Sequence, residues 1–229
     1  MCFDEKTSWL TLSIGSIINI GVLLYLGIEH NKSHNNLIYP IVIVLYFQYT
    51  LLMQIPDGIA WRQLRKNKKI EPSTKNLAFG LNTTQPLISG LLVFMVCIYT
   101  KQPLPVQFWI GVVLLLIYIS LLSFEKVTEA KMAPTPQCKH LLYEWWSTED
   151  EKKNIRRTTQ FVLYAIIILL FVSVLPQLWW ATGTAIFLGT LALTTYMYPC
   201  SNGSLWCWSI AYASIVVLIV DTMQRKVFK

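Results

Sequence analysis

Seven long apolar stretches are the feature that most constrains this chain. Each has about 20 residues, the length that an α-helix needs to cross the hydrocarbon core of a bilayer. None of them alternates apolar and polar residues for about ten positions, as a strand of a membrane barrel would. We therefore predict an all-α polytopic membrane protein, in which a single domain forms a bundle of seven transmembrane helices. The expected spans are residues 8–28, 37–61, 77–100, 105–124, 158–177, 179–199 and 205–222, with a long loop at 125–157.

The charge content agrees with a membrane location. Only 14% of the residues are charged, whereas a soluble domain has about a quarter, and the mean hydropathy is +0.48. The net charge of +7 at first suggests a nucleic-acid partner. The basic residues lie between apolar runs, however, and not along one soluble face, so we expect no nucleic acid. The expected partners are the lipid bilayer and anionic lipid head groups beside the basic loops.

The lysine and arginine residues predict the orientation. Residues 62–76 contain six of them and residues 125–157 contain seven, and Lys6 precedes the first span. Only five lie in the remaining connections and the C-terminal tail. Since cytoplasmic loops carry the excess of basic residues, we predict that the N-terminus lies inside and the C-terminus outside.

Five polar side chains are expected within the second and third spans. Gln54 and Asp57 are three residues apart and share a helix face. Asn82 and Gln85 have the same spacing at a similar depth, and Gln48 lies near the middle of the second span. We predict a ligand site formed by Gln54, Asp57, Asn82 and Gln85, with Gln48 as a further candidate. The alternative is that these groups only join helices, which contributes about 0.6 kcal/mol per hydrogen bond on average.

Two prolines accompany these polar residues. Proline has no N–H group, so Pro56 is expected to free the carbonyl of Leu52, and Pro86 that of Asn82. Free carbonyls in interrupted membrane helices coordinate cations or polar solutes. This pattern favours an inward-facing binding or permeation site.

The loop at 125–157 contains aromatic residues but no recognisable catalytic set. Tyr143, Trp145 and Trp146 are expected at the inner membrane surface, where aromatic side chains concentrate, and we predict that they form a partner interface. Cys138 and His140 are two residues apart and point to different faces of a helix. No cysteine pair has metal-ligand spacing. We therefore expect no catalytic residue, no metal and no cofactor.

Three further features have predicted structural roles. Ala181, Ala185 and Gly189 form a stripe of small residues, for which we favour a contact inside the bundle over one between two copies of the chain. Asn19, in the middle of the first span, is expected to make a packing hydrogen bond. Asp221 is expected to be a solvated residue at the end of the last span.

Two short patterns and one dipeptide resemble an uncharacterised family of seven-span membrane proteins encoded by large DNA viruses. The resemblance implies a seven-span topology and no particular chemistry. The residues that carry it are Gln85-Pro86, Cys138 with Leu142-Tyr143-Glu144-Trp145, and Cys200 with Leu205-Trp206-Cys207-Trp208.

Three functions remain open at this point. The first is transport or conduction of a small solute or ion along the polar side chains of the second and third spans. The second is a sensor or binding module that does not transport. The third is a protein that shapes or assembles a viral or organelle membrane through its basic loops and interfacial aromatic residues. A homo-oligomer is a further candidate partner. An enzyme is a weaker fourth alternative, because the sequence contains no paired carboxylates, histidine cluster or phosphate-binding loop.

Overall fold

The chain forms a bundle of long helices with one short β-hairpin. The computed structural model describes residues 4–30, 37–67, 69–123, 132–134, 141–143, 151–197 and 202–227. Strands β1 (Met132–Pro134) and β2 (Leu141–Tyr143) pair antiparallel, with Met132 opposite Tyr143. The helices of the described residues are α1 (Glu5–His30), α2 (Ile38–Leu51), α3 (Gln54–Asn67), α4 (Pro72–Thr83), α5 (Gln85–Thr100), α6 (Val106–Leu122), α7 (Glu151–Val172), α8 (Gln177–Met197) and α9 (Asn202–Val227).

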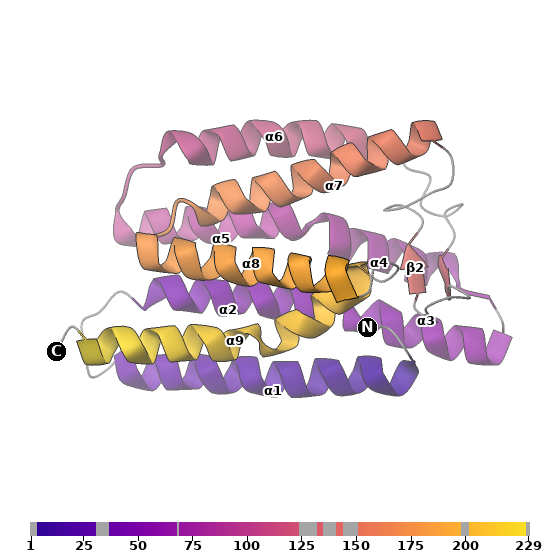
Figure 1. The fold of residues 1–229 in the computed structure, drawn as a ribbon, viewed down its shortest axis with the longest axis horizontal. Coiled ribbons are helices and arrows are strands. Elements are labelled where there is room, and N and C mark those ends of the chain that lie inside the picture. Colours follow the sequence, from indigo (N-terminus) through magenta and orange to yellow (C-terminus); the bar gives the residue numbers. More distant parts are fainter. Residues whose placement is uncertain are drawn as a thin grey trace.

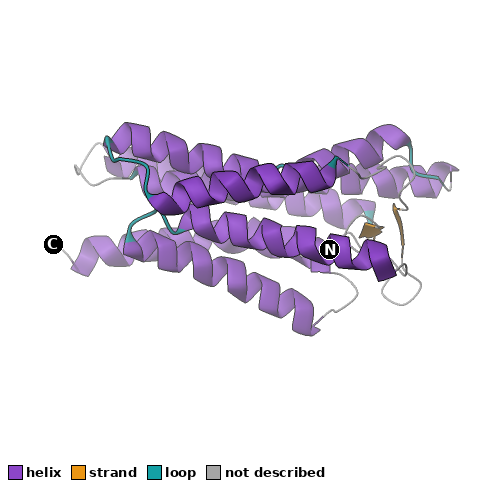
Figure 2. Ribbon diagram, turned by 90° about the horizontal axis from the view of Figure 1, so that it is seen from above, coloured by secondary structure: helices purple, strands orange, loops and turns teal. Residues whose placement is uncertain are grey.

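The helices lie side by side along the long axis of the molecule (Figure 1). Helices α1 and α9 occupy one side of the bundle and α6 and α7 the other, with α2, α5 and α8 between them. The view from above shows the same elongated arrangement (Figure 2). The C-terminus lies at one end of the bundle, and α1 begins near the other end, beside α3, α4 and the hairpin.

Several helices are long and apolar enough to cross a membrane. Among the described residues these are Glu5–Ile28, Ile38–Lys66 and Ile155–Val172, or four spans if the bent pair Pro72–Thr83 and Gln85–Thr100 is counted as one. Helix α6 is apolar but has only 17 residues. The prediction of a helical protein is therefore confirmed, and several of its helices are long and apolar enough to cross a membrane, whereas the multi-pass topology, the number of seven spans and their orientation stay predictions.

The two predicted proline sites coincide with interruptions of the helices. Between α2 and α3 the backbone changes to shorter-range bonds, and the N–H of Ile55 donates to the carbonyl of Leu52 at 3.0 Å. The prediction that Pro56 leaves this carbonyl free is therefore wrong, because the neighbouring N–H takes the place of the missing one. At Pro86 the axes of α4 and α5 bend by 43°. A hydrogen bond of 2.5 Å between the hydroxyls of Tyr49 and Thr84 places the two interruptions side by side.

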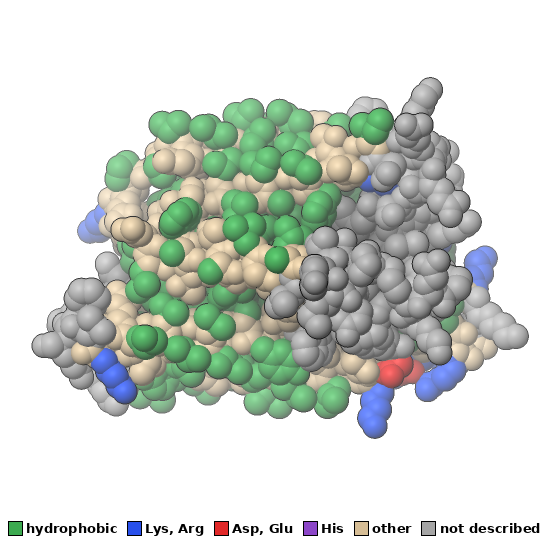
Figure 3. Space-filling model, in the orientation of Figure 1, with side chains coloured by type: hydrophobic (Ala, Val, Ile, Leu, Met, Phe, Trp, Pro, Cys, Tyr) green, Lys and Arg blue, Asp and Glu red, His purple; other side chains and the backbone are tan. Residues whose placement is uncertain are grey.

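Many large apolar side chains are exposed on this molecule, while several polar side chains are buried. Ile17 and Val106 are 70% and 71% exposed, while Asn19, Gln54 and Ser214 are fully buried. Apolar side chains cover most of the central part of the face in Figure 3, and the described lysine and arginine side chains lie toward its two ends. A surface of this kind is stable in contact with hydrocarbon and unstable in water.

The aromatic ring of Phe171 packs at the contact between α5, α6 and α7. Phe171 of α7 is buried between Gly90 of α5 and Gly111 of α6. A Cβ atom at either glycine would lie 2.8 Å from carbon atoms of this ring, which is closer than real Cβ atoms approach other atoms. Only glycine therefore allows these three helices their present separation.

The described parts of both lysine-rich connections meet at the same end of the bundle. Glu5, at the start of α1, forms ion pairs with Arg62 at 2.7 Å and with Arg65 at 2.8 Å. This end also has its own small apolar core, which is separate from the main core of the bundle. The buried residues of this second core are Met53, Ala60, Ile70, Ala78, Met132 and Leu141.

Candidate functional site

Gln48, the most central of the five predicted ligand residues, takes part in a network that joins three helices. Its Oε1 accepts a hydrogen bond from Asn19 Nδ2 at 2.9 Å, and its Nε2 donates to Ser16 Oγ at 3.1 Å. Ser214 Oγ of α9 donates to Asn19 Oδ1 at 2.5 Å. The geometry agrees with the packing hydrogen bond expected of Asn19, and it uses both side-chain polar atoms of Gln48 within the bundle.

Gln54 and Asp57 lie in the first turn of α3 and are both buried. The positive end of the helix dipole favours a carboxylate at this position. Within the described part of the chain, neither polar atom of the Gln54 side chain has a hydrogen-bond partner. A buried polar group without a partner costs about 1–3 kcal/mol, so Gln54 is a strained position beside the interruption between α2 and α3.

Asn82 and Gln85 do not share one continuous helix, because the interruption at Thr84 separates them. Asn82 belongs to α4 and is half-buried, whereas Gln85 is the first residue of α5 and is fully buried. The hydroxyl of Tyr164 on α7 donates a hydrogen bond to Gln85 Oε1. Gln85 thus connects α5 with α7.

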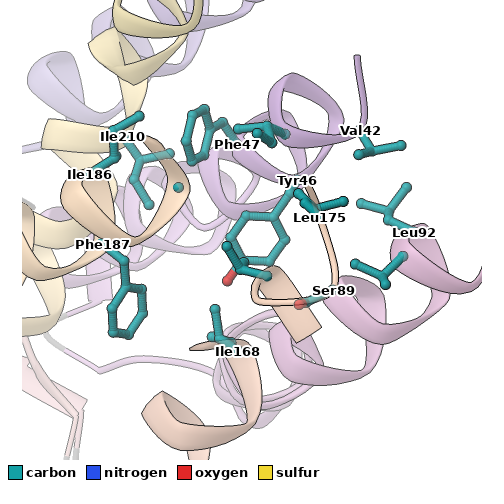
Figure 4. A pocket seen from close by; sticks show the side chains of 14 residues that line it. Val42, Tyr46, Phe47, Ser89, Leu92, Ile168, Leu175, Ile186, Phe187 and Ile210 are labelled. Atoms are coloured by element: carbon teal, nitrogen blue, oxygen red, sulfur yellow. The ribbon is translucent and has the colours of Figure 1, made fainter. Parts of the chain in front are cut away.

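The described residues also line a partly open cavity of about 40 Å³ between α2, α5, α7, α8 and α9. Tyr46 and Ser89 are its polar lining residues, and the other lining residues are apolar, among them Phe47, Leu92 and Ile186 (Figure 4). None of the five residues of the predicted ligand site lines it. The cavity therefore suits an uncharged and mainly apolar group.

The sequence gives little indication of this cavity. Its lining residues come from five helices and from the turn between α7 and α8, and each occupies an ordinary position in an apolar run. A cavity of this kind depends on how whole helices pack, and a local pattern does not report that.

The predicted partner interface is only partly within the described structure. Tyr143 ends strand β2 and pairs with Met132 through the backbone, and its side chain is not described. Trp145 and Trp146 lie outside the described residues. The interface stays a prediction.

Two of the predicted structural roles are wrong. Asp221 is buried, not solvated, and its carboxylate accepts a hydrogen bond from Arg225 Nε at 2.7 Å. The small-residue stripe of Ala181, Ala185 and Gly189 is exposed, and a Cβ atom at Gly189 would meet no atom within 4 Å. The stripe therefore makes no close helix contact at Gly189, and the contact between two copies stays the open alternative.

No group of three or more histidine, cysteine, aspartate or glutamate residues within the described part of the chain is arranged to hold a metal ion. No protein-family model, curated protein or solved structure matches this chain. The resemblance to the viral seven-span family stays a prediction, and the function has to be argued from the geometry alone.

Proposed function

We propose that this chain is a seven-span membrane protein that binds a small apolar molecule in the cavity between α2, α5, α7, α8 and α9. Of the three functions that the sequence leaves open, this is the binding module that does not transport. The observation that carries the proposal is the cavity itself, which has an almost entirely apolar lining and lies apart from the polar residues predicted to guide a solute. The transport role of those residues stays a prediction.

Membrane insertion is supported by the buried polar network and the apolar exterior. Each of the seven predicted spans overlaps a helix or a pair of successive helices. In the orientation that we propose, the end with Arg62, Arg65 and Lys66 faces the cytosol. Their cationic groups would lie close to anionic lipid head groups, which attract basic residues at the membrane surface.

This orientation predicts opposite labelling of two exposed positions. Lys69, between α3 and α4, is replaced by cysteine in one variant, and Gln102, between α5 and α6, in another. In intact cells a membrane-impermeant maleimide should modify Gln102→Cys and leave Lys69→Cys unmodified until the membrane is permeabilised. Peptide mass spectrometry locates the label among the native cysteines. Modification of both positions from the outside would contradict the proposed topology.

The cavity has to select its ligand by packing and not by hydrophobicity. Lipid tails are as apolar as a leucine side chain, so moving an apolar molecule from the bilayer into the protein gains little from the hydrophobic effect. The gain comes from close contacts with rings such as Phe47 and Phe187, each atom pair contributing about 0.1–0.2 kcal/mol. A cavity of about 40 Å³ therefore favours a compact ligand over a lipid chain.

Xenon is a suitable probe, because it binds apolar cavities in proteins. We expect the protein in lipid nanodiscs to give a ¹²⁹Xe saturation-transfer signal that is distinct from xenon dissolved in lipid. Ile186→Phe fills the cavity and should abolish this signal. Leu188→Phe adds a ring on the same helix, at a side chain that is 47% exposed, and should leave the signal unchanged. If Ile186→Phe behaved like Leu188→Phe, the cavity would not be the binding site.

A further inference from the structure

Two arginines of α3 share a single carboxylate of α1. Glu5 forms ion pairs with Arg62 Nε at 2.7 Å through Oε1 and with Arg65 Nη2 at 2.8 Å through Oε2. Arg62 and Arg65 are three residues apart, so they lie on the same face of their helix. The carboxylate therefore holds the two guanidinium groups next to each other. Figure 3 shows acidic and basic side chains together at this end of the molecule.

The packing of α1 against α3 sets the position of this carboxylate. A Cβ atom at Gly58 would lie 2.7 Å from Cε2 of the Trp9 ring, so the two helices are in close contact there. Glu5 precedes Trp9 by four residues, and Arg62 follows Gly58 by four. With this spacing each charged residue lies one turn farther along the same helix face. The ion pairs are thus placed by a close contact between two helices, and not by flexible side chains alone.

Most N–H donors of the two arginines remain available. An arginine has five N–H donors, and Glu5 is the only partner of either arginine within the described part of the chain. The side chains of Arg62 and Arg65 are 54% and 71% exposed, whereas that of Glu5 is 15% exposed. The carboxylate is therefore covered, and the two cations are accessible from outside.

A phosphomonoester is the anion that suits two adjacent guanidinium groups. Arginine binds phosphate through two parallel N–H···O hydrogen bonds. A terminal phosphate offers three acceptor oxygens and carries a charge of about −1.5 to −2 at neutral pH. The phosphodiester of an ordinary anionic lipid has only two unesterified oxygens, so it satisfies two arginines less completely.

We propose that Arg62 and Arg65 bind the phosphomonoester head group of a membrane lipid, as in phosphatidic acid. The proposal rests on the membrane insertion proposed above and not on the cavity, and it adds a particular lipid class to the general attraction between basic residues and anionic lipids. A lipid is the expected source because Arg62 directly follows the predicted span 37–61, at the level where head groups begin. Glu5 orients the two arginines for this ligand.

Native mass spectrometry of the protein in a non-ionic detergent counts bound lipids and tests this preference. Phosphatidic acid is compared with phosphatidylglycerol of the same acyl chains, which has a phosphodiester. We expect phosphatidic acid to bind at about tenfold lower concentration, as one additional hydrogen bond to a charged group would give. Equal binding of the two lipids would overturn the phosphate site and leave the cavity untouched, whereas a missing xenon signal would overturn the cavity and not this site.

Variants separate geometry from charge. Arg62→Lys and Arg65→Lys keep the positive charges but lose the planar fork of donors, and each should reduce the preference for phosphatidic acid at least threefold. Lys101→Gln removes an exposed charge at the other end of the bundle and should keep the full preference. An unchanged preference in both lysine variants would mean attraction by charge alone and would overturn the proposal. Both arginines are exposed, so these variants should fold like the unmodified protein.

Glu5→Gln tests the orienting role of the carboxylate. Removing this negative charge should strengthen the binding of phosphatidylglycerol, because the arginines lose their competing anion. The preference for phosphatidic acid should nevertheless fall at least twofold, because the two guanidinium groups are no longer held together. An undiminished preference would overturn the orienting role of Glu5.

A soluble phosphate ester distinguishes a lipid from a free anion. Glycerol 3-phosphate carries the head group of phosphatidic acid without its acyl chains. On the unmodified protein, a tenfold excess should leave bound phosphatidic acid in place. Displacement at a concentration equal to that of the lipid would identify a soluble phosphate ester as the ligand and overturn the assignment to a lipid.

Discussion

Replacing Gly90 and Gly111 together by alanine is expected to remove most of the stability of the bundle. Each new Cβ atom would lie 2.8 Å from carbon atoms of the Phe171 ring, one from α5 and the other from α6. The ring cannot move away from one methyl group without approaching the other. Overpacking of a core costs about 1–3 kcal/mol per site, so we expect a loss of about 2–6 kcal/mol in the free energy of unfolding. SDS titration of the protein in mixed micelles, followed by tryptophan fluorescence, measures it.

A matched pair of glycines provides the control for this experiment. Gly21 and Gly189 also lie within helices, and a Cβ atom at either would meet nothing within 4 Å. Replacing both by alanine should leave the protein unchanged or stabilise it by up to about 1 kcal/mol per site, because alanine has the higher helix propensity. Adding Phe171→Leu to the Gly90 and Gly111 variant should restore part of the lost stability. An equal change in the free energy of unfolding for the two pairs of glycines would contradict the tight packing around Phe171.

Removing Arg225 is expected to have the second largest effect. Its Nε lies 2.7 Å from Asp221 Oδ2, and the two side chains are only 12% and 5% exposed. Arg225→Gln leaves the buried carboxylate without its cation, and breaking a buried ion pair in this way costs about 3–5 kcal/mol. The same SDS titration measures the change in the free energy of unfolding.

Lys226→Gln is the control, because it removes the same charge from the exposed neighbouring position. We expect it to change the stability by less than about 0.5 kcal/mol, as surface substitutions usually do. Replacing Asp221 and Arg225 together by leucine should recover most of the loss, since apolar residues substitute well for a buried pair. A loss in the double variant as large as that in Arg225→Gln would mean that the ion pair is not the cause.

The positions of the helices could be predicted from the sequence because the signal is long and local. About 20 consecutive apolar residues leave the backbone no other way to pair its polar groups in hydrocarbon. Details at single residues could not be predicted so well. The missing N–H of Pro56 predicts a free Leu52 carbonyl, but Ile55 donates to this carbonyl through a shorter-range bond. Such changes in backbone hydrogen bonding depend on how the neighbouring side chains pack around the turn.

The candidate site could be predicted only in part, for a related reason. The spacing of Asn82 and Gln85 places them on one face only if the helix is continuous, and the bend at Thr84 removes this condition. The sequence places Gln85 within a span as a candidate ligand residue, but it does not indicate the hydrogen-bond partner Tyr164, which is 79 positions away. The position of Asp221 at the end of an apolar run predicts a solvated residue, whereas the helix continues beyond it and brings Arg225 one turn away.

The break between α2 and α3 and the bend between α4 and α5 lie side by side, joined by the hydrogen bond between Tyr49 and Thr84. Both therefore lie at the same level along the bundle. Beyond that level, α3, α4 and the hairpin have their own apolar core, which shares no buried residue with the main core. Segments with a separate core open independently of the rest of a protein. Helix α1 packs against both α3 and α2, so it is an element through which a local opening of this end would reach the helices around the cavity.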